Sequence, residues 1–402
     1  MTTVSDSTVR EPGALRAAMV SALRDEGAIT SEPVAAAFAV VPRHLFAPDA
    51  PLELAYDLHR TVPVKKDENG LDISVMSAAH LQAVMLEQAG IAPGMKVLEI
   101  GSGGVNAAYL RELVGNEGEV TTVDIDRDII DRARLCLDDA GYTRVKTVLA
   151  DGETGVPDGA PYDRIIVTAA AWDIPPSWIS GLTGNGRLVV PLTVRGTTRS
   201  IAFDRDGEGL VSRSYRLARF VPMQGEGTAE ERKVMLREGV ALQTDDVRVR
   251  LTAEVLNHAL DTPRLERWSG AAFDLPDELE LYLTLHLSSP ARLHAAKDVV
   301  ESGLVEASAL LGVPALVSED SIAYRTRREN EDIGVGFESG VIAHGPQAEA
   351  LADEYVNLLR HWAQDHRRRG AATFRYLPGP APTPLPQDAV LRRHGAVTVV
   401  WH

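Results

Sequence analysis

The sequence predicts an α/β protein in which a doubly wound, mostly parallel sheet is followed by a second, α+β domain. Apolar strand-like segments alternate with helix-like segments between residues 95 and 193, and such alternation is typical of a parallel sheet with helices on both faces. One strand-like segment, residues 96–100, runs directly into a glycine-rich turn. Around residue 225 the composition becomes polar and glycine-rich, which indicates a domain boundary.

The residues before the alternating region are predicted to form helices around one extended segment. In order, the predicted elements are a helix at 14–26, a helix at 32–41, an extended segment at 55–74 and a helix at 77–88. Ser31 can cap the second helix through its hydroxyl, and Gly27 and Gly90 each follow a helix, where glycine is a common terminator. Asn69 and Gly70 predict a turn within the extended segment.

The alternating region is predicted to supply five strands of the sheet. The predicted strands are 97–100, 120–124, 145–150, 164–168 and 187–192, with helices at 106–114 and 128–140 between them. Short apolar runs of this kind are typical of strands buried on both faces. Segments 200–203, 210–213 and 218–222 could add antiparallel strands at one edge.

We expect a first domain of residues 1–225 and a second domain of residues 226–402. The clearest element of the second domain is a helix at 346–369, which has one apolar face and is followed by Gly370. Its other segments fit alternating strands, or a strand and a helix. The proline-rich stretch LPGPAPTPLPQ is predicted to be extended. The residues of this domain offer no chemical motif.

The composition limits the classes of function. The formal net charge is −16, which argues against nucleic acid as a partner, because phosphate binding needs a cationic surface. The single cysteine, Cys136, excludes an internal disulfide and lies in a helical pattern, where an inert buried thiol is expected. Neither a membrane-spanning apolar run nor a signal peptide is recognisable, so we expect a cytoplasmic protein without a membrane partner.

Candidate ligand-binding residues follow the predicted strands at one edge of the sheet. Gly101 and Gly103 follow the first strand and let the backbone approach a ligand closely. Asp124 ends the second strand, where an acid can accept hydrogen bonds from both hydroxyls of a ribose. Asp151–Gly152 follows the third strand. The glycine spacing differs from the G-x-G-x-x-G of dinucleotide enzymes.

Residues 24–227 resemble the protein-L-isoaspartate O-methyltransferases, which use S-adenosylmethionine. The matching stretches occur in the family's order, and they are VPRHLFAP, AYDLHRTVPV, LDIS, KVLEIGSG, VDID, YDRIIVTAAA, VVPL and FVPM. The resemblance implies a Rossmann-like class I methyltransferase sheet. It also implies S-adenosylmethionine as cofactor, with S-adenosylhomocysteine as product, and a peptide carboxylate as methyl acceptor.

The sequence departs from the family pattern where the family holds its peptide. Asp72 replaces a threonine, Val75–Met76 replace a proline-containing turn, and the glycine loop GSGGVNAA is one residue shorter. The added residues 225–402 resemble the FxLD-type extended homologues found with lanthipeptide and other ribosomal peptide biosynthesis. Those enzymes methylate an aspartate of a modified precursor peptide, and the ester collapses to aspartimide or isoaspartate.

The resemblance assigns roles to individual residues. Ser74 is expected to hold the substrate carboxylate through its hydroxyl, although it could instead only turn the chain before the next helix. The residues expected to bind the cofactor are Glu99, Gly101, Ser102, Gly103, Asp124, Ile125, Asp151, Gly152 and Thr168. Of these, Glu99 could instead hydrogen-bond the loop, and Asp151 could instead only turn the chain before Gly152. Those expected to contact substrate are Asp72, Val75, His80 and Asn106, the last of which could instead cap a helix. No metal site is expected.

The expected function is methylation of an aspartate side chain in a ribosomally synthesised, lanthipeptide-type precursor peptide, leading to aspartimide. The alternative with the same chemistry is repair of isoaspartyl residues in damaged proteins. Two other classes of function have less support from the sequence. They are a nicotinamide-linked oxidoreductase, which the loop spacing disfavours, and a non-catalytic scaffold that binds S-adenosylmethionine. The expected partner is a modified precursor peptide or an isoaspartyl protein, and the chain is expected to be a monomer or a homodimer.

Overall fold

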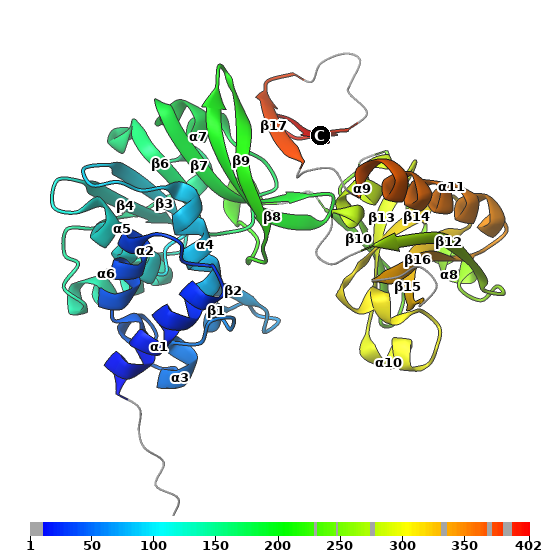
Figure 1. Cartoon of the computed structure of the whole chain (residues 1–402), viewed down its shortest axis with the longest axis horizontal. Helices are drawn as coiled ribbons and strands as arrows, with labels where there is room; N and C mark the ends of the chain where they lie inside the picture. Colours follow the sequence, from blue (N-terminus) through cyan, green and yellow to red (C-terminus); the bar gives the residue numbers. More distant parts are fainter. Residues whose placement is uncertain are drawn as a thin grey trace, which may run out of the picture. The chain divides into compact units, whose positions relative to one another are not determined.

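The computed structural model describes residues 11–228, 231–246, 248–273, 278–330, 336–367, 372–380 and 388–402. The chain divides into two compact units (Figure 1). The first unit is Met1–Thr193 with Thr198–Ala229, and the second is Val194–Thr197 with Glu230–His402. Among the described residues, no helix is both long and apolar enough to cross a lipid bilayer.

A mostly parallel sheet forms the centre of the first unit. Its strands lie in the order β9-β8-β7-β6-β3-β4-β5. Their bounds are β3 Lys96–Ile100, β4 Glu119–Asp124, β5 Lys146–Leu149, β6 Tyr162–Val167, β7 Leu182–Val194, β8 Thr197–Asp206 and β9 Gly209–Leu217. Strands β3 to β7 pair in parallel, and β8 with β9 antiparallel. From β3 the chain adds β4 and β5 on one side of the sheet and then β6 and β7 on the other. The predicted doubly wound class is therefore confirmed.

The helices of the first unit begin and end close to the positions that capping signals predict. They are α1 Pro12–Asp25, α2 Glu32–Val40, α3 Leu52–Ala55, α4 Ala79–Ala89, α5 Val105–Val114, α6 Arg127–Asp139 and α7 Pro176–Gly181. The Ser31 hydroxyl accepts the N–H of Val34 at the start of α2, as predicted, and Gly90 adopts a left-handed φ of +57° after α4. Cys136 is buried in α6, as predicted.

The predicted extended segment is a two-stranded antiparallel hairpin. Its strands are β1 (Val62–Lys66) and β2 (Asp72–Met76). The carboxylate of Asp67 accepts backbone N–H groups from Asn69 and Leu71, each within 2.9 Å, and Gly70 has a φ of +80°. The turn predicted from Asn69–Gly70 is therefore confirmed.

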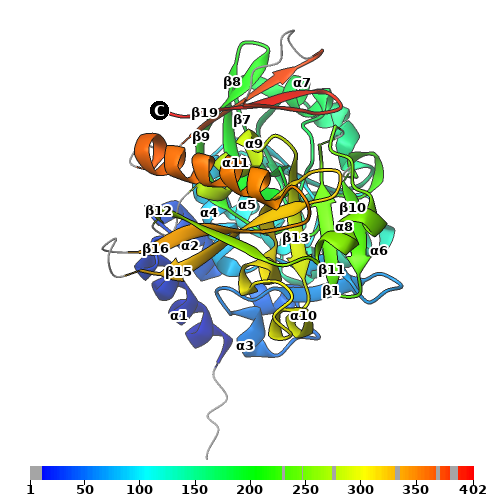
Figure 2. The same ribbon diagram turned by 90° about the vertical axis from the view of Figure 1, so that its right-hand side faces the viewer.

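The second unit is α+β, as predicted, and contains an antiparallel sheet in the order β10-β11-β13-β14-β15-β16-β12. The strands are β10 Arg232–Arg237, β11 Val240–Thr244, β12 Leu265–Phe273, β13 Pro290–Ala295, β14 Val313–Val317, β15 Ile322–Glu329 and β16 Phe337–His344. The helices are α8 Ala253–Ala259, α9 Leu279–His286, α10 Lys297–Glu301 and α11 Ala348–His361. Strands β17 Thr373–Pro378, β18 Ala389–Leu391 and β19 Gly395–Val400 form a further antiparallel group. Figure 2 shows α11 running across the sheet, where Leu351, Tyr355 and Leu359 are buried.

Three expectations differ from the structure. Residues 218–222 are not a strand, because Pro222 lacks an N–H and makes only an isolated bridge with Ala170. Segments 253–259 and 279–286 of the second domain, expected as alternating strands or as a strand and a helix, are both helices. The helix expected at 346–369 is α-helical from Ala348 to His361 and continues as a π-helix to His366. Its last residues, and the proline-rich residues 381–387, lie outside the described residues.

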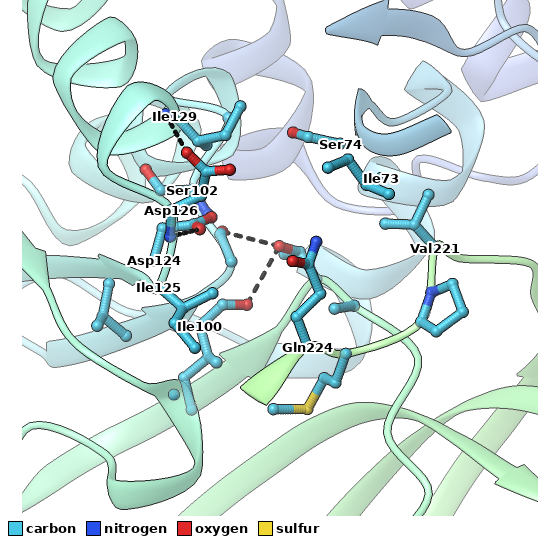
Figure 3. A pocket seen from close by; sticks show the side chains of 18 of the residues that line it. Ile73, Ser74, Ile100, Ser102, Asp124, Ile125, Asp126, Ile129, Val221 and Gln224 are labelled. Atoms are coloured by element: carbon cyan, nitrogen blue, oxygen red, sulfur yellow. Dashed lines mark hydrogen bonds between the residues drawn. The ribbon is translucent and has the colours of Figure 1, made fainter. Parts of the chain in front are cut away.

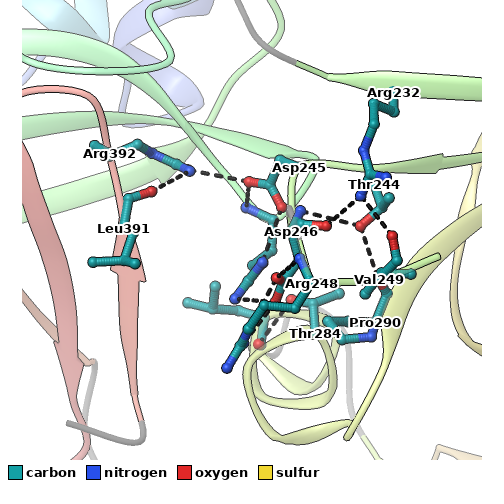
Figure 4. A network of polar contacts seen from close by, with 12 residues as sticks. Arg232, Thr244, Asp245, Asp246, Arg248, Val249, Thr284, Pro290, Leu391 and Arg392 are labelled. Atoms are coloured by element: carbon teal, nitrogen blue, oxygen red, sulfur yellow. Dashed lines mark hydrogen bonds and ion pairs between the residues drawn. The ribbon is translucent and has the colours of Figure 1, made fainter. Parts of the chain in front are cut away.

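A buried network of ion pairs lies in the second unit (Figure 4). The Asp245 carboxylate lies 3.2 Å from Arg195 and 3.2 Å from Arg392, and all three side chains are at most 8% exposed. Asp246 pairs with Arg195 at 3.0 Å and with Arg248 at 2.6 Å. Burial would raise the pKa of Asp246, but the hydrogen bonds from Arg248 and the charge of Arg195 outweigh it and lower that pKa to about 2. The Asp246 carboxylate is therefore held ionised by arginines.

Candidate functional site

A cavity of about 710 Å³ opens at the carboxyl ends of the parallel strands. It lies where β3, β4 and β6 end, next to the switch point of the sheet, which is where ligands bind in this class of fold. The lining residues come from β2, from the strand ends and the turns that follow them, from the start of α6 and from the segment after β9 (Figure 3). They are Ile73, Ser74, Val75, Ile100, Gly101, Ser102, Gly103, Val123, Asp124, Ile125, Asp126, Ile129, Gly152, Thr168, Ala169, Val221, Pro222, Met223 and Gln224.

Gly101 and Gly152 line the cavity at positions where a neighbouring side chain leaves no room for a Cβ atom. Gly101 has a φ of +92°, and a Cβ there would lie 2.6 Å from the Thr168 hydroxyl, which donates to the carbonyl of Gly101. A Cβ on Gly152 would lie 2.4 Å from the side chain of Ile100. Gly104, the third glycine of the loop, has a φ of +83° and is the N-cap of α5. The third glycine therefore starts a helix and does not line the cavity.

Asp124 presents its carboxylate to the cavity, as predicted from its place at the end of β4. One oxygen accepts the backbone N–H of Ser102 at 2.8 Å and the other accepts that of Asp126 at 2.9 Å. Burial raises the pKa of the Asp124 carboxyl, although these N–H groups oppose that shift. Each carboxylate oxygen has a second acceptor position, so the group can also accept hydrogen bonds from a pair of hydroxyls.

Two walls face each other across the cavity. Figure 3 shows Ser74 and Ile73, from β2, on the opposite side from Asp124 and Asp126. The residues of β2 are partly exposed up to the buried Met76. The hydroxyl of Ser74 is thus the polar group that β2 presents beside the apolar side chains of Ile73 and Val75.

The buried side chains of Glu99 and Asn106 hydrogen-bond to each other. Glu99 is fully buried and accepts hydrogen bonds from the Asn106 amide at 2.9 Å and the Thr122 hydroxyl at 2.6 Å. Burial raises the pKa of Glu99 to about 7 against the opposing effect of these two donors. Neither side chain lines the cavity, because β3 alternates its side chains and the Glu99 side chain points beneath the loop. Glu99 thus hydrogen-bonds a residue of the stretch GSGGVNAA, one of its two expected partners, and the cofactor contact of Glu99 and the substrate contact of Asn106 stay predictions.

Asp151 also lies outside the cavity lining, although Gly152 belongs to it. Its carboxylate accepts the backbone N–H groups of Glu153 at 2.9 Å and Glu226 at 3.0 Å. The second bond holds the segment that follows Met223 and Gln224 against the cavity. Asp151 thus turns the chain before Gly152, the alternative expected for it, and supports the wall, while its cofactor contact stays a prediction.

A wider cavity of about 1490 Å³ adjoins the first and shares Val75, Val221 and Pro222 with it. Two of the expected substrate residues, Asp72 and His80, line this outer cavity. Nε2 of His80 lies 4.0 Å from Glu26, and its ring centroid lies 5.2 Å from that of His59. Burial and the neighbouring His59 lower the pKa of His80.

The lining also includes residues that the sequence did not single out. Ile73, Asp126 and Ile129 neighbour predicted residues, and the run VDID followed by a helix start could have identified Asp126. Val221, Pro222 and Met223 belong to the matching stretch FVPM and Gln224 follows it, but a proline after an apolar pair gives no signal of a ligand. Among the described residues, no group of three or more His, Cys, Asp or Glu side chains is placed to hold a metal ion.

Residues 14–228 match the family model of protein-L-isoaspartate(D-aspartate) O-methyltransferases. A protein-L-isoaspartate O-methyltransferase of Methanococcoides burtonii is 38% identical over 210 residues, which cover 52% of this chain and 98% of that protein. One of Hyperthermus butylicus is 40% identical over 222 residues, which cover 52% of this chain and 89% of that protein. A solved structure named as a protein-L-isoaspartate O-methyltransferase aligns with 84% of this chain and 90% of its own, at 22% identity and a TM-score of 0.49.

Proposed function

Because the chain belongs to the protein-L-isoaspartate(D-aspartate) O-methyltransferase family, we propose that it methylates the free carboxylate of isoaspartyl residues in peptides and proteins. Family membership makes it an S-adenosylmethionine-dependent carboxyl O-methyltransferase. The observation that carries the proposal is a cavity that has a carboxylate on one wall, Asp124, and a hydroxyl on the other, Ser74.

The lining residues fit a nucleoside-containing cofactor. Asp124 can accept both hydroxyls of a ribose, and the apolar side chains of Ile100, Ile125 and Ile129 can flank a purine ring. The hydroxyl of Ser102 is buried and has no hydrogen-bond partner among the described residues. Because a buried hydroxyl is costly when unpaired, a polar group of a ligand would complete its bonding.

Bound S-adenosylmethionine would supply an electrophilic methyl group. The acceptor carboxylate is already ionised at neutral pH, so the chain needs no general base. Its tasks are to orient the carboxylate, for which Ser74 can donate a hydrogen bond, and to exclude water, which would stabilise the charged reactants. Val75, Val221 and Met223 supply apolar surface for the second task.

The outer cavity supports a peptide as the acceptor. It is wide, opens to solvent and meets the cofactor cavity at Val75, Val221 and Pro222. An isoaspartyl residue projects its free carboxylate on a short branch, so a chain lying in the outer cavity can extend that carboxylate toward Ser74. Asp72 and His80 would then flank the peptide.

The test is methyl transfer by the full chain to two synthetic peptides that differ only in carrying isoaspartate or aspartate. The proposal expects a base-labile methyl ester on the isoaspartyl peptide and little or none on the aspartyl peptide. Absence of an ester on the isoaspartyl peptide, from a chain that binds S-adenosylhomocysteine, would refute it.

A dedicated precursor peptide is the second candidate substrate, as the sequence first suggested. The family match and the named relatives support the isoaspartyl reaction better. What favours the second candidate is the unit of residues 230–402, which lies beyond the family match, together with Asp72 in the outer cavity. In this case the second unit would bind the precursor. Methylation of a cyclised aspartate-containing precursor, followed by loss of methanol, would support it, whereas an unmodified precursor would exclude it.

A further inference from the structure

The hairpin that carries Ser74 has little support from its own ladder. β1 and β2 form a sheet of only two strands, and an isolated two-stranded hairpin is marginally stable at best in water. Register shifts interrupt the pairing on both sides of Lys65, between Pro63 and Lys65 and between Lys65 and Lys66. Other contacts must therefore fix the position of Ser74.

Lys65 lies opposite Ser74 in this ladder and reaches the facing wall of the cavity. The two residues are register partners. Nζ of Lys65 lies 2.6 Å from Oδ2 of Asp126 and 2.8 Å from Oδ2 of Asp128. Asp126 lines the cavity, and its Oδ1 accepts the N–H of Asp128 at 2.9 Å and caps α6. The Lys65 side chain therefore links strand β1, at the position opposite Ser74, to the segment that directly follows Asp124.

This ion pair is more sheltered than a typical surface pair. The side chain of Lys65 is 32% exposed and that of Asp126 is 19% exposed, compared with 80% for Asp128. Partly sheltered pairs are screened less by solvent and salt than exposed ones. Hydrogen bonds to Asp126 and Asp128 raise the pKa of Lys65, which keeps the ammonium charged.

We propose that Lys65 is a positioning residue for methyl transfer, which anchors the β1–β2 hairpin to Asp126 and so keeps the Ser74 hydroxyl at the cofactor cavity. The inference rests on the proposed function, in which Ser74 orients the acceptor carboxylate. Lys65 itself does not line the cavity, so its effect on the reaction passes through the hairpin.

The test compares three variants of the full chain with the unaltered protein. Lys65→Met removes the charge, and Lys65→Arg retains it. Lys96→Met is the matched control, because Lys96 is 33% exposed and pairs with Glu119 at 3.5 Å, but lies at the start of β3, away from the cavity. Two quantities are measured: kcat for the isoaspartyl peptide, and hydrogen exchange of backbone amides in residues 72–76 with S-adenosylhomocysteine bound.

Lys65→Met is expected to lower kcat about 10-fold, since small misplacements of an orienting group have effects of this size or larger. It should raise exchange in residues 72–76 several-fold and leave the KM for the peptide nearly unchanged. Lys65→Arg should restore most of both readouts, and Lys96→Met should alter neither.

The two readouts separate failure of this inference from failure of the proposed function. Unchanged exchange in Lys65→Met overturns the anchoring role whatever the activity, and raised exchange with an unchanged kcat overturns the positioning role. If the unaltered protein methylates no isoaspartyl peptide, the proposed function fails. The exchange data alone then decide whether Lys65 anchors the hairpin.

Discussion

Ser74 is the residue on which the proposed orientation of the acceptor depends. Ser74→Ala removes the hydroxyl and keeps the β-strand backbone. We expect kcat for an isoaspartyl peptide to fall by about 100-fold, the lower end of the loss seen when one hydrogen-bond donor to a reacting group is removed. Affinity for S-adenosylhomocysteine should remain the same, since Asp124 and Ser102 lie on the other wall. Calorimetric binding together with initial rates checks both parts, and an unchanged kcat would contradict the role of Ser74.

Glu99 predicts a pH dependence of stability. Its pKa is about 7 in the folded protein and 4.5 in the reference state. Between these values the unfolded chain releases a proton that the folded chain keeps, so the free energy of unfolding falls as pH rises from about 4.5 to about 7. The loss for this shift is about 3 kcal/mol.

Glu99→Gln should therefore flatten the decline in unfolding free energy between pH 5 and pH 8, because the amide does not titrate. Urea unfolding at the two pH values measures the difference. Glu119→Gln is the control, since the Glu119 side chain is 70% exposed. Equal slopes for Glu99→Gln and the unaltered protein would show that Glu99 does not titrate as described.

The segment after β9 supports one wall of the cavity and can be tested at a single glycine. Gly225 has a φ of +74°, and a Cβ there would lie 2.3 Å from the Asp151 carboxylate and 2.6 Å from Ile125. Gly225→Ala should push this segment away from the cavity and weaken binding of S-adenosylhomocysteine about 10-fold, which corresponds to about 1.4 kcal/mol.

Gly207→Ala is the control for this variant, because Gly207 also has a left-handed φ of +62° but no atom within 4 Å of the added Cβ. It should leave cofactor affinity unchanged although it strains the backbone. If both substitutions weakened binding equally, general strain would explain the loss, and the contact with Asp151 and Ile125 would not.

The elements of the first unit were predictable where the signal is local. Buried parallel strands are continuous apolar runs, and their carboxyl ends meet at one edge, so Asp124, Gly101 and Thr168 could be brought together from the sequence. The segment Val221–Gln224 could not, because its place depends on a long-range contact between Glu226 and Asp151. Glu99 shows the same limit: whether a strand carboxylate meets a ligand or the residues of the loop depends on packing.

At the scale of the whole molecule, the two units are not joined at a single point of the chain. Residues Val194–Thr197, between β7 and β8, belong to the second unit, so the chain passes between the units three times. Truncation after residue 229 would leave Arg195 without Asp245 and Asp246. Point variants therefore test the second unit more cleanly than truncation.

Asp245→Ala should destabilise the protein by about 3 to 5 kcal/mol, because it removes one anion from a buried network of charges and weakens the charge compensation of two buried arginines. The affected side chains are Arg195 and Arg392, which are 8% and 0% exposed. Asp261→Ala is the control, since the Asp261 side chain is 57% exposed in its pair with Arg237. That substitution should cost at most about 1 kcal/mol. Urea unfolding compares the two, and similar losses would contradict the importance of the buried network.

The most direct test of the proposed function is a competition experiment analysed by intact mass. The full chain, S-adenosylmethionine, an isoaspartyl peptide and its aspartyl counterpart are incubated in one solution. The isoaspartyl peptide should gain one methyl group and later lose methanol as its ester cyclises, while the aspartyl peptide stays unmodified. Methylation of the aspartyl peptide alone, or of neither peptide, would contradict the assignment of isoaspartate as the substrate.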